Sequence, residues 1–581
     1  MRISNDAIIY SVVFLLSFIT FYAFLKIGVR RIAERVTERP LLYISISLII
    51  VGVLGIGIKN LTLEPDMKVL LPKNMESVRT FDRIEELFGG LETVYFCVTA
   101  KNGTIWDAHI LSQINAMGKK IQTCPNVDRI LSITEMKSIS NREDVMEVSS
   151  IIPENATVVR PEDVDLIRSR VKENDVAYKR LISRDEKSAL IVASVNMHVK
   201  ETLPDGRKTT RFAQDKEFCE PTPDTPDKPT FVNIMNQFAD PAYKITVTGF
   251  PYIRYNLWLQ MAADMKVFLV LGIVVMLAFL YASFRTLRGM LLPLIVVLLS
   301  VIASFGFMGW MREKITLPFT IMAPMLIAIA HNYGTQLIAK YYEDVQDARG
   351  RLKQSDVRQI AGHGIVSIGA PVFISAITVI VGFVTMISHP IRGLALLGFF
   401  CAFGIIAAFN LTILFHTAIL SFMSVPKMLL DKQHGAMTDK VLKSVAEFTI
   451  RRKIEMLAGM LLLAALCIYF IPKIEVDANV MNEFPKSSFI YRDAQFISDS
   501  FGGYSTFNLL IEATRPVPDD SPEDGPMKNP EVLKWMEGLQ NYALAQKDPR
   551  TGGRLIGDAL SMADLVSYMN RVMKDDVREN R

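Results

Sequence analysis

The sequence predicts a polytopic α-helical membrane protein with eight spans and extracytoplasmic α+β domains, built as a tandem duplication whose second copy is incomplete. Two observations lead to this fold class. Half of the 581 residues are hydrophobic, and they gather in unbroken runs instead of recurring at core periodicity. In addition, a segment that follows one of these runs reappears in the same context near the end of the chain.

Eight runs contain no Asp, Glu, Lys or Arg, and each is about as long as, or longer than, the ~20 residues with which a helix crosses a bilayer. This pattern excludes a soluble enzyme. We expect the first run to be a retained span and not a cleaved signal peptide, because it is long and a basic cluster follows it. The runs are Ile8–Leu25, Pro40–Ile58, Val267–Phe284, Gly289–Met311, Ile315–Ala339, Gly364–Ser388, Gly393–Pro426 and Met456–Pro472.

Basic residues are concentrated in three short loops, at 26–39, 340–363 and 427–453. Short loops rich in Lys and Arg remain in the cytoplasm, so alternation places 59–266 and the residues after 473 outside. Because these charges flank hydrophobic runs and set topology, the sequence excludes nucleic acid as a partner.

The outside segment between the second and third runs predicts alternating strands and helices, an α+β arrangement of the split βαβ kind. A Pro- and Asp-rich stretch, Leu203–Pro229, is predicted to be a loop or flap. The expected strands are Thr93–Ala100, Arg129–Thr134, Ala189–His198 and Tyr243–Phe250, and the expected helices are Ala108–Gln122, Pro161–Val176 and Thr230–Phe238.

An internal repeat relates PKNMESVRTFDRIEELFGG (Pro72–Gly90) to PKSSFIYRDAQFISDSFGG (Pro485–Gly503) without a gap. Both copies follow a hydrophobic run and precede a strand-like segment, so the repeating unit is one span, one outside domain and five further spans. The second unit breaks off before its five spans, which leaves two alternatives: a fragment, or a chain completed by another polypeptide. The matched pairs include Pro72/Pro485, Phe88/Phe501, Gly89/Gly502 and Gly90/Gly503.

These boundaries divide the chain into seven parts. They are an extra N-terminal span with its basic loop (1–35), the first repeat span (36–59), the outside domain (60–264), a five-span bundle (265–426), a cytoplasmic loop (427–453), the first span of the second repeat (454–472) and the incomplete second outside domain (473–581).

Four segments together resemble the resistance-nodulation-division superfamily, in its MMPL-type branch of hydrophobe and amphiphile exporters related to sterol-sensing-domain proteins. The segments are the repeated motif, the T-G-F-P turn at Thr248–Pro251, HNYGTQLIAKYYEDV at His331–Val345, and Gly369–Ile405. The resemblance implies ferredoxin-like porter domains on the periplasmic side of a bacterial inner membrane. It also implies proton-driven movement of lipids or other amphiphiles.

Polar residues inside hydrocarbon are candidates for function, because placing them there is costly. Three consecutive spans each have a polar face, and an interior shared by these helices or plain interhelical packing would explain them. The residues are Thr320, Asn332 and Gln336; Ser375, Thr378 and Thr385; and Asn410 and Thr417.

The triplet His331–Asn332–Tyr333 is the sharpest of these features. The resemblance places a proton-carrying carboxylate directly before the Tyr, whereas this sequence has Asn332, whose amide has no titrating proton. Three alternatives remain: the neighbouring His331 titrates instead, the carboxylates lie in the absent second bundle, or the protein is not proton-driven. The competing interpretation of His331 is a neutral, hydrogen-bonded side chain. His416 is a separate, further candidate for coupling.

No catalytic or metal-ligating residues are predicted, and neither is a cofactor. The glycine pairs of the repeat fit helix C-caps better than phosphate loops, since no G-x-x-x-x-G-K-[ST] occurs. Of the three outside cysteines, Cys124 and Cys219 could form a disulfide, or all three could remain thiols.

The favoured function is therefore a secondary transporter that exports lipids or other amphiphiles across or out of the membrane. A non-transporting lipid- or sterol-sensing subunit and an accessory of protein export are the alternatives. The expected partners are the amphiphilic substrate, the membrane and, if the chain is complete, a second polypeptide.

Overall fold

The computed structural model divides into two compact units, which we call the bundle unit (Met1–Pro72 and Trp258–Ala478) and the sheet unit (Lys73–Leu257 and Asn479–Arg581). The described residues are 28–64, 72, 75–90, 92–142, 145–152, 158–174, 178, 180–202, 208–220, 229–348, 354–423, 436–474, 481, 484–503, 506–512, 529–547, 552 and 554–573.

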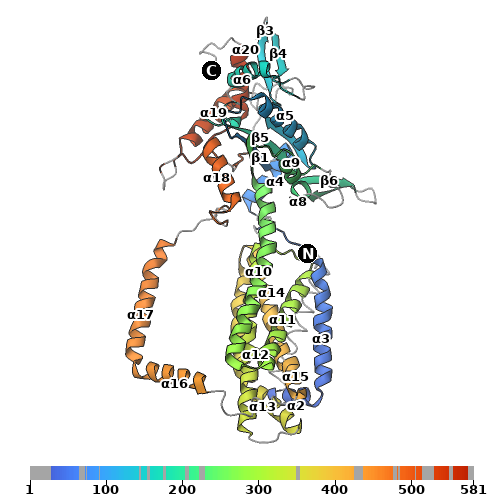
Figure 1. Cartoon of the computed structure of the whole chain (residues 1–581), viewed down its shortest axis with the longest axis vertical. Helices are drawn as coiled ribbons and strands as arrows, with labels where there is room; N and C mark the ends of the chain where they lie inside the picture. The colour runs from blue at the N-terminus through green and yellow to red at the C-terminus, as the bar shows by residue number, and fades with distance from the viewer. Residues whose placement is uncertain are drawn as a thin grey trace. The chain divides into compact units, whose positions relative to one another are not determined.

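Six of the described helices are long and apolar enough to cross a membrane (Figure 1). The structure thus agrees with the predicted polytopic, multi-pass membrane protein. The six are α3 (Pro40–Ile56) with its 3-10 extension η1 (Gly57–Asn60), α10 (Phe250–Phe284), α11 (Leu287–Trp310), α13 (Gln354–Thr385), α14 (Arg392–Leu411) with the turns that follow it, and α17 (Lys453–Phe470).

The other two predicted spans stay predictions. The run Ile8–Leu25 lies outside the described residues. The run Ile315–Ala339 forms η4 (Leu317–Ile321) and α12 (Met322–Asp347), which is not among the six because His331, Asn332 and its charged last turns lower its hydropathy. Nevertheless α12 packs in the bundle core, where Leu326 and Ala330 are fully buried.

Glycines allow two helices of the bundle unit to touch backbone to backbone. A Cβ atom on Gly306 of α11 would lie 2.1 Å from the carbonyl oxygen of Leu54, and one on Gly309 would lie 1.9 Å from that of Gly57. Small residues at such crossings are how transmembrane helices approach closely. The contact fixes α3 against α11.

The sheet unit contains a four-stranded sheet in the order β2-β5-β1-β8, with all neighbours antiparallel. Helix α5 (Ala108–Gln122) connects β1 to β2, and α9 (Phe231–Gln237) precedes β8. This is the split βαβ topology that the sequence predicts. The strands are β1 (Glu92–Ala100), β2 (Val127–Ser132), β5 (Ser188–Val195) and β8 (Tyr243–Thr248).

Two hairpins extend from this sheet unit, β3 (Lys137–Arg142) with β4 (Val145–Ser150), and β6 (His198–Thr202) with β7 (Lys208–Phe212). Within Leu203–Pro229, which the sequence predicts to be a loop or flap, β7 pairs with β6 in a hairpin. The expectation of a loop is wrong at α8 (Lys216–Cys219). The Pro and Asp residues of this stretch obscured the strand-forming KTTRF segment, whose pairing with β6 decides its conformation.

The second repeat contributes a helix to the first repeat's sheet. Helix α18 (Phe489–Phe501), the counterpart of α4 (Glu76–Phe88), packs on β8, and its Ile497 is fully buried in the core of the sheet unit. The remaining described helices are α2 (Val29–Glu38), α6 (Val164–Glu173), α15 (Thr417–Phe422), α16 (Ala436–Arg451), α19 (Pro530–Ala545) and α20 (Met562–Met573).

Candidate functional site

The most unusual polar group in the bundle unit is His416. It is fully buried, and neither ring nitrogen has a hydrogen-bond partner among the described residues. It ends η6 (Thr412–His416), a π-helical turn between α14 and α15. Single π turns inside helices are frequent at functional sites. The Thr417 hydroxyl spans the widened turn by donating to the Thr412 carbonyl oxygen at 3.4 Å.

Three elements meet at His416. A Cβ atom on Gly334 of α12 would lie 3.4 Å from His416 Nδ1 and 3.2 Å from the Cα atom of Pro293 in α11. The glycine therefore leaves room for both neighbours. Beside it, Tyr333 is almost completely buried, and its hydroxyl has no described partner. Gly334 and Pro293 were not singled out from the sequence, since only packing reveals their position next to the histidine.

An imidazole needs a partner for its N–H and another for its lone pair. Leaving such groups unpaired in a buried site costs about 1–3 kcal/mol each, so proteins seldom retain them without a functional reason. No Asp or Glu lies in the apolar runs, and His416 and His331 are the histidines within them.

The residues of the His331–Tyr333 triplet point in different directions. His331 is half-buried, its Nδ1 lies 3.2 Å from the Ile327 carbonyl oxygen, and its ring meets the ring of Phe279 edge-on. Asn332 is exposed, and its side-chain oxygen accepts from Gln336 Nε2 at 3.3 Å. Only Tyr333 faces the core.

The predicted polar faces do not form one buried interior in the described bundle. Thr378 and Thr385 are exposed, and each donates to a carbonyl of its own helix α13, at 2.9 and 2.7 Å. Such back-bonding satisfies a hydroxyl without any neighbouring helix. Ser375, Thr320 and Asn410 are half-buried, whereas Thr417 is fully buried beside His416.

The repeat motif has a structural explanation. Gly89 and Gly502 end α4 and α18 with positive φ angles of 82° and 89°, which glycine adopts most easily. A Cβ atom on Gly90 would lie 2.4 Å from the Val195 carbonyl oxygen. Phe88 is exposed, Phe501 packs against the core of the sheet unit, and Pro72 and Pro485 lie outside helices.

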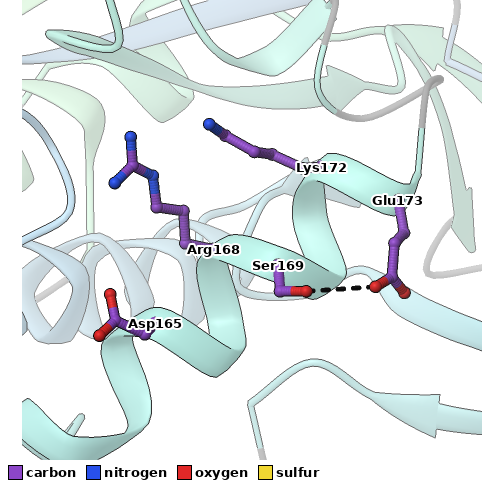
Figure 2. A pocket seen from close by; sticks show the side chains of 5 residues that line it. All are labelled: Asp165, Arg168, Ser169, Lys172 and Glu173. Atoms are coloured by element: carbon purple, nitrogen blue, oxygen red, sulfur yellow. Dashed lines mark hydrogen bonds between the residues drawn. The ribbon is translucent and has the colours of Figure 1, made fainter.

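The sheet unit has a pocket of about 540 Å³ on the surface of α6, lined by Asp165, Arg168, Ser169, Lys172 and Glu173 (Figure 2). Its two cations are already engaged, because Glu186 accepts from Arg168 Nη2 at 2.5 Å and from Lys172 Nζ at 2.8 Å. Trp106 Nε1 and Tyr178 Oη also donate to this carboxylate, at 2.8 and 2.7 Å.

Burial raises the pKa of Glu186, but the hydrogen bonds from Lys172, Tyr178, Trp106 and Arg168 outweigh it and lower the pKa to about 2. The charged carboxylate is thus the stable form at neutral pH. This cluster fixes α6 to the turn before β5.

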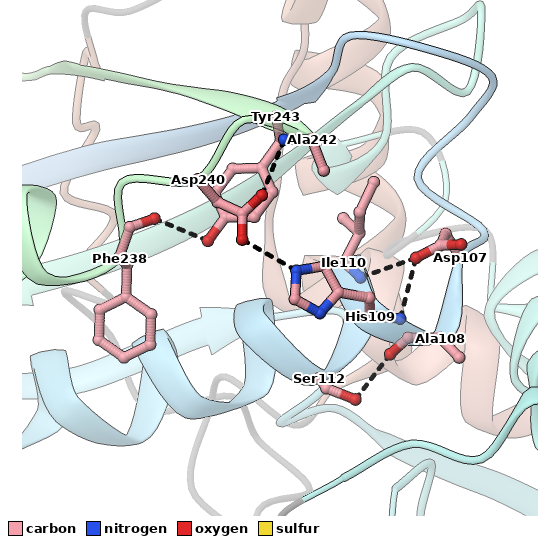
Figure 3. Close-up of polar contacts among 9 residues, drawn as sticks. All are labelled: Asp107, Ala108, His109, Ile110, Ser112, Phe238, Asp240, Ala242 and Tyr243. Carbon is pink, nitrogen blue, oxygen red and sulfur yellow. Dashed lines mark hydrogen bonds and ion pairs between the residues drawn. The ribbon is translucent and has the colours of Figure 1, made fainter.

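Figure 3 shows a histidine–carboxylate pair at the start of α5, where His109 Nε2 lies 3.0 Å from Asp240 Oδ2. The nearby Ser112 hydroxyl donates to the Ala108 carbonyl oxygen at 2.6 Å and accepts from Val159 N at 2.8 Å. Both of these bonds tie Ser112 to backbone atoms, so its hydroxyl has a structural role. The His109–Asp240 pair joins α5 to the turn before β8.

Arg254, in the second turn of α10, forms a buried cluster with two carboxylates. Its Nη1 donates to Glu92 at 2.8 Å, and its Nε and Nη2 donate to Asp215 at 3.0 and 2.8 Å. The three side chains are 9–12% exposed. The cluster joins β1, α8 and α10, and sequence reasoning missed it because its members lie up to 162 positions apart.

Cys97, Cys124 and Cys219 of the sheet unit are free thiols. Burial raises the pKa of Cys97 to about 11 and that of Cys124 to about 12, and burial also raises the pKa of Cys219. All three are therefore protonated at neutral pH and unreactive as nucleophiles. The Cys124–Cys219 disulfide is absent from the structure.

Apolar helices around a buried histidine, with a separate α+β unit, define a multi-pass membrane protein. The sequence model of the MMPL family matches residues 69–453, more than half of the chain, and the protein belongs to this family. It is also 23% identical over 381 residues to a membrane protein of Methanocaldococcus jannaschii, an alignment that covers 65% of this chain and 89% of the relative.

Proposed function

We propose that this protein is a secondary transporter that moves lipids or other amphiphiles, and that His416 is the group that binds and releases the coupling proton. Membership of the MMPL family supports transport of hydrophobic substrates by a membrane protein. The observation that supports the role of His416 is its complete burial beside Gly334, with neither ring nitrogen hydrogen-bonded to any residue that the structure describes.

Protonation would give His416 a second N–H donor and a charge inside the bundle. A charge there strengthens the demand for partners or water, so it favours a different arrangement of the helices around the π turn. A secondary transporter must alternate between two such arrangements to carry its substrate. The amide of Asn332 cannot do this, since it does not titrate.

The test is transport in proteoliposomes with an imposed pH gradient and fluorescent phosphatidylglycerol as the probe. We expect His416→Gln to abolish gradient-driven movement of the probe, because glutamine can hydrogen-bond but does not titrate. His331→Gln is the matched control, a half-buried histidine in the same unit, and should retain movement.

Full gradient-driven transport by His416→Gln would contradict the assignment of the proton to His416. If His331→Gln is the inactive variant instead, the proton passes through the α12 triplet. If the wild-type protein binds the probe but never moves it, a lipid-sensing subunit is the better explanation.

We further propose that the sheet unit lies on the periplasmic side of a bacterial inner membrane. The basic loops at 340–363 and 427–453 support this orientation. Protease digestion of spheroplasts tests it: cleavage within the sheet unit from outside is expected, and protection of that unit would contradict it.

A further inference from the structure

Helix α2 (Val29–Glu38) has two faces of opposite chemistry. Val29, Ile32, Ala33 and Val36 recur at spacings of three and four, which places them on one face of the helix. Ala33 is 2% exposed, Val36 is completely buried, and the other two pack against the bundle core. The apolar face of α2 is therefore already covered by the bundle.

The contact between α2 and α13 is close. A Cβ atom on Gly362 would lie 3.7 Å from Thr37 Cγ2, and the Thr37 hydroxyl donates to the Ala33 carbonyl oxygen at 2.9 Å. The helix consequently presents a fixed opposite face.

That opposite face is basic. Arg30, Arg31 and Arg35 are exposed, and exposed Arg39 follows directly after the helix. The side chain of Arg30 is 84% exposed and forms an ion pair with Glu34, with 3.3 Å between Nε and Oε1. Among the described residues, no carboxylate lies within ion-pair distance of Arg31 or Arg35. With four arginines against Glu34 and Glu38, residues 29–39 carry a net charge of +2.

The position of α2 along the chain indicates where its basic face lies relative to a membrane. Pro40 begins α3, one of the six membrane-length helices, so one residue separates α2 from a transmembrane segment. Because α2 ends directly before this membrane-length helix begins, its basic face is expected at the level of the lipid headgroups. Arginine forms paired hydrogen bonds with phosphate oxygens, which suits it to phospholipids with a net negative charge.

We infer that the basic face of α2, defined by Arg30, Arg31, Arg35 and Arg39, binds the headgroups of anionic phospholipids at the membrane surface. The apolar face holds the helix on α13, and the arginines attach that end of the bundle to the lipid. This site is separate from His416 and does not depend on transport. If the arginines only orient the chain during insertion, the folded protein has no such lipid preference.

The experiment measures binding of phosphatidylglycerol, added to neutral detergent micelles, to the purified full chain by thermal-shift titration, with phosphatidylcholine as the reference lipid. We expect tighter binding of phosphatidylglycerol, weakened by high salt. Each basic residue near the headgroups should contribute about fivefold, so Arg30→Gln/Arg31→Gln/Arg35→Gln should lose roughly a hundredfold in affinity.

The matched control is Arg83→Gln/Arg129→Gln/Arg160→Gln, which removes the same charge from exposed side chains of the sheet unit. It should bind like the wild-type protein. The charge-preserving Arg31→Lys variant should lose far less affinity than Arg31→Gln, and it remains informative if the triple variant does not fold.

Three results would overturn the inference: equal binding of both lipids, equal loss in the α2 and control variants, or displacement of the lipid by inorganic phosphate at matched concentration. The last result would assign the face to a soluble anion. Because transport is not measured, failure here leaves the His416 proposal standing, and a failed His416 test leaves this one standing.

Discussion

At the scale of single residues, a titratable side chain of the bundle unit and one of the sheet unit differ in their hydrogen bonding. His416 has no described partner for either ring nitrogen, whereas the Glu186 carboxylate accepts four hydrogen bonds from three segments of the chain. The first environment leaves a proton site unsatisfied, and the second holds one charge state firmly. His416 is therefore a candidate for proton transfer, whereas Glu186 has a structural role.

Glu186 should make the stability of the sheet unit pH-dependent. Its folded pKa of about 2 lies below the ordinary value of 4.5, so its contribution is present above pH 4.5 and is lost as pH falls toward 2. We expect Glu186→Gln to lower the free energy of unfolding at pH 7 by on the order of 2 kcal/mol. Denaturant unfolding at pH 7 and pH 3 checks this, and an undiminished effect at pH 3 would contradict it.

Gly334 should tolerate no side chain without movement of α11 or η6. In Gly334→Ala the new Cβ would press on the backbone of Pro293, at 3.2 Å, and we expect a loss of about 1–3 kcal/mol. Gly382→Ala in α13 is the control, because nothing lies within 4 Å of its Cβ position and alanine favours the helix. Thermal unfolding in detergent should therefore rank Gly334→Ala well below Gly382→Ala. Equal midpoints would show that the contact is not tight.

At the scale of elements, the junction between β8 and α10 is built from a turn and an ionic cluster. Gly249 has a φ of 119°, and a Cβ atom there would lie 2.2 Å from the Thr93 carbonyl oxygen. One turn later Arg254 binds Glu92, the residue before Thr93. Both contacts hold the first turns of α10, which belong to the sheet unit, against the start of β1.

Arg254→Met should destabilise the sheet unit by about 3–5 kcal/mol, because it leaves two buried carboxylates without their cation. Arg160→Met is the control, since its ion pairs with Glu162 and Asp163 are exposed, and it should change stability by less than about 0.5 kcal/mol. Denaturant unfolding of the full chain measures both. A small effect for Arg254→Met would mean that water reaches Glu92 and Asp215.

At the scale of the whole molecule, segments that contain the two copies of the repeat pack together within the sheet unit. Helix α18 of the second repeat covers β8 of the first, with Asp493 3.4 Å from Lys244 Nζ. In the other direction, Glu512 of the second repeat lies 2.7 Å from Arg83 of α4. The second repeat is thus part of the unit formed by the first and stabilises it.

Ile497→Ala should therefore destabilise a core whose strands all come from the first repeat. We expect a loss of about 2–5 kcal/mol, as for other buried isoleucines. The neighbouring Phe496→Ala, at a side chain that is 38% exposed, should cost much less. Hydrogen exchange in β8 gives the readout, and unchanged protection of β8 in Ile497→Ala would show that α18 is not required there.

The membrane class, most spans and the split βαβ sheet could be predicted from the sequence, because long apolar runs and strand propensity are local patterns. The gapless repeat is also a local pattern, and the duplication inferred from it stays a prediction. The sequence also indicated His331 and His416 as coupling candidates, and it already set Asn332 aside because an amide does not titrate. Only the tertiary structure shows that Asn332 is exposed and that His416 is fully buried next to Gly334. It likewise decided the clusters of Glu186 and Arg254, since burial and partners depend on contacts between segments distant in sequence, which composition and spacing do not encode.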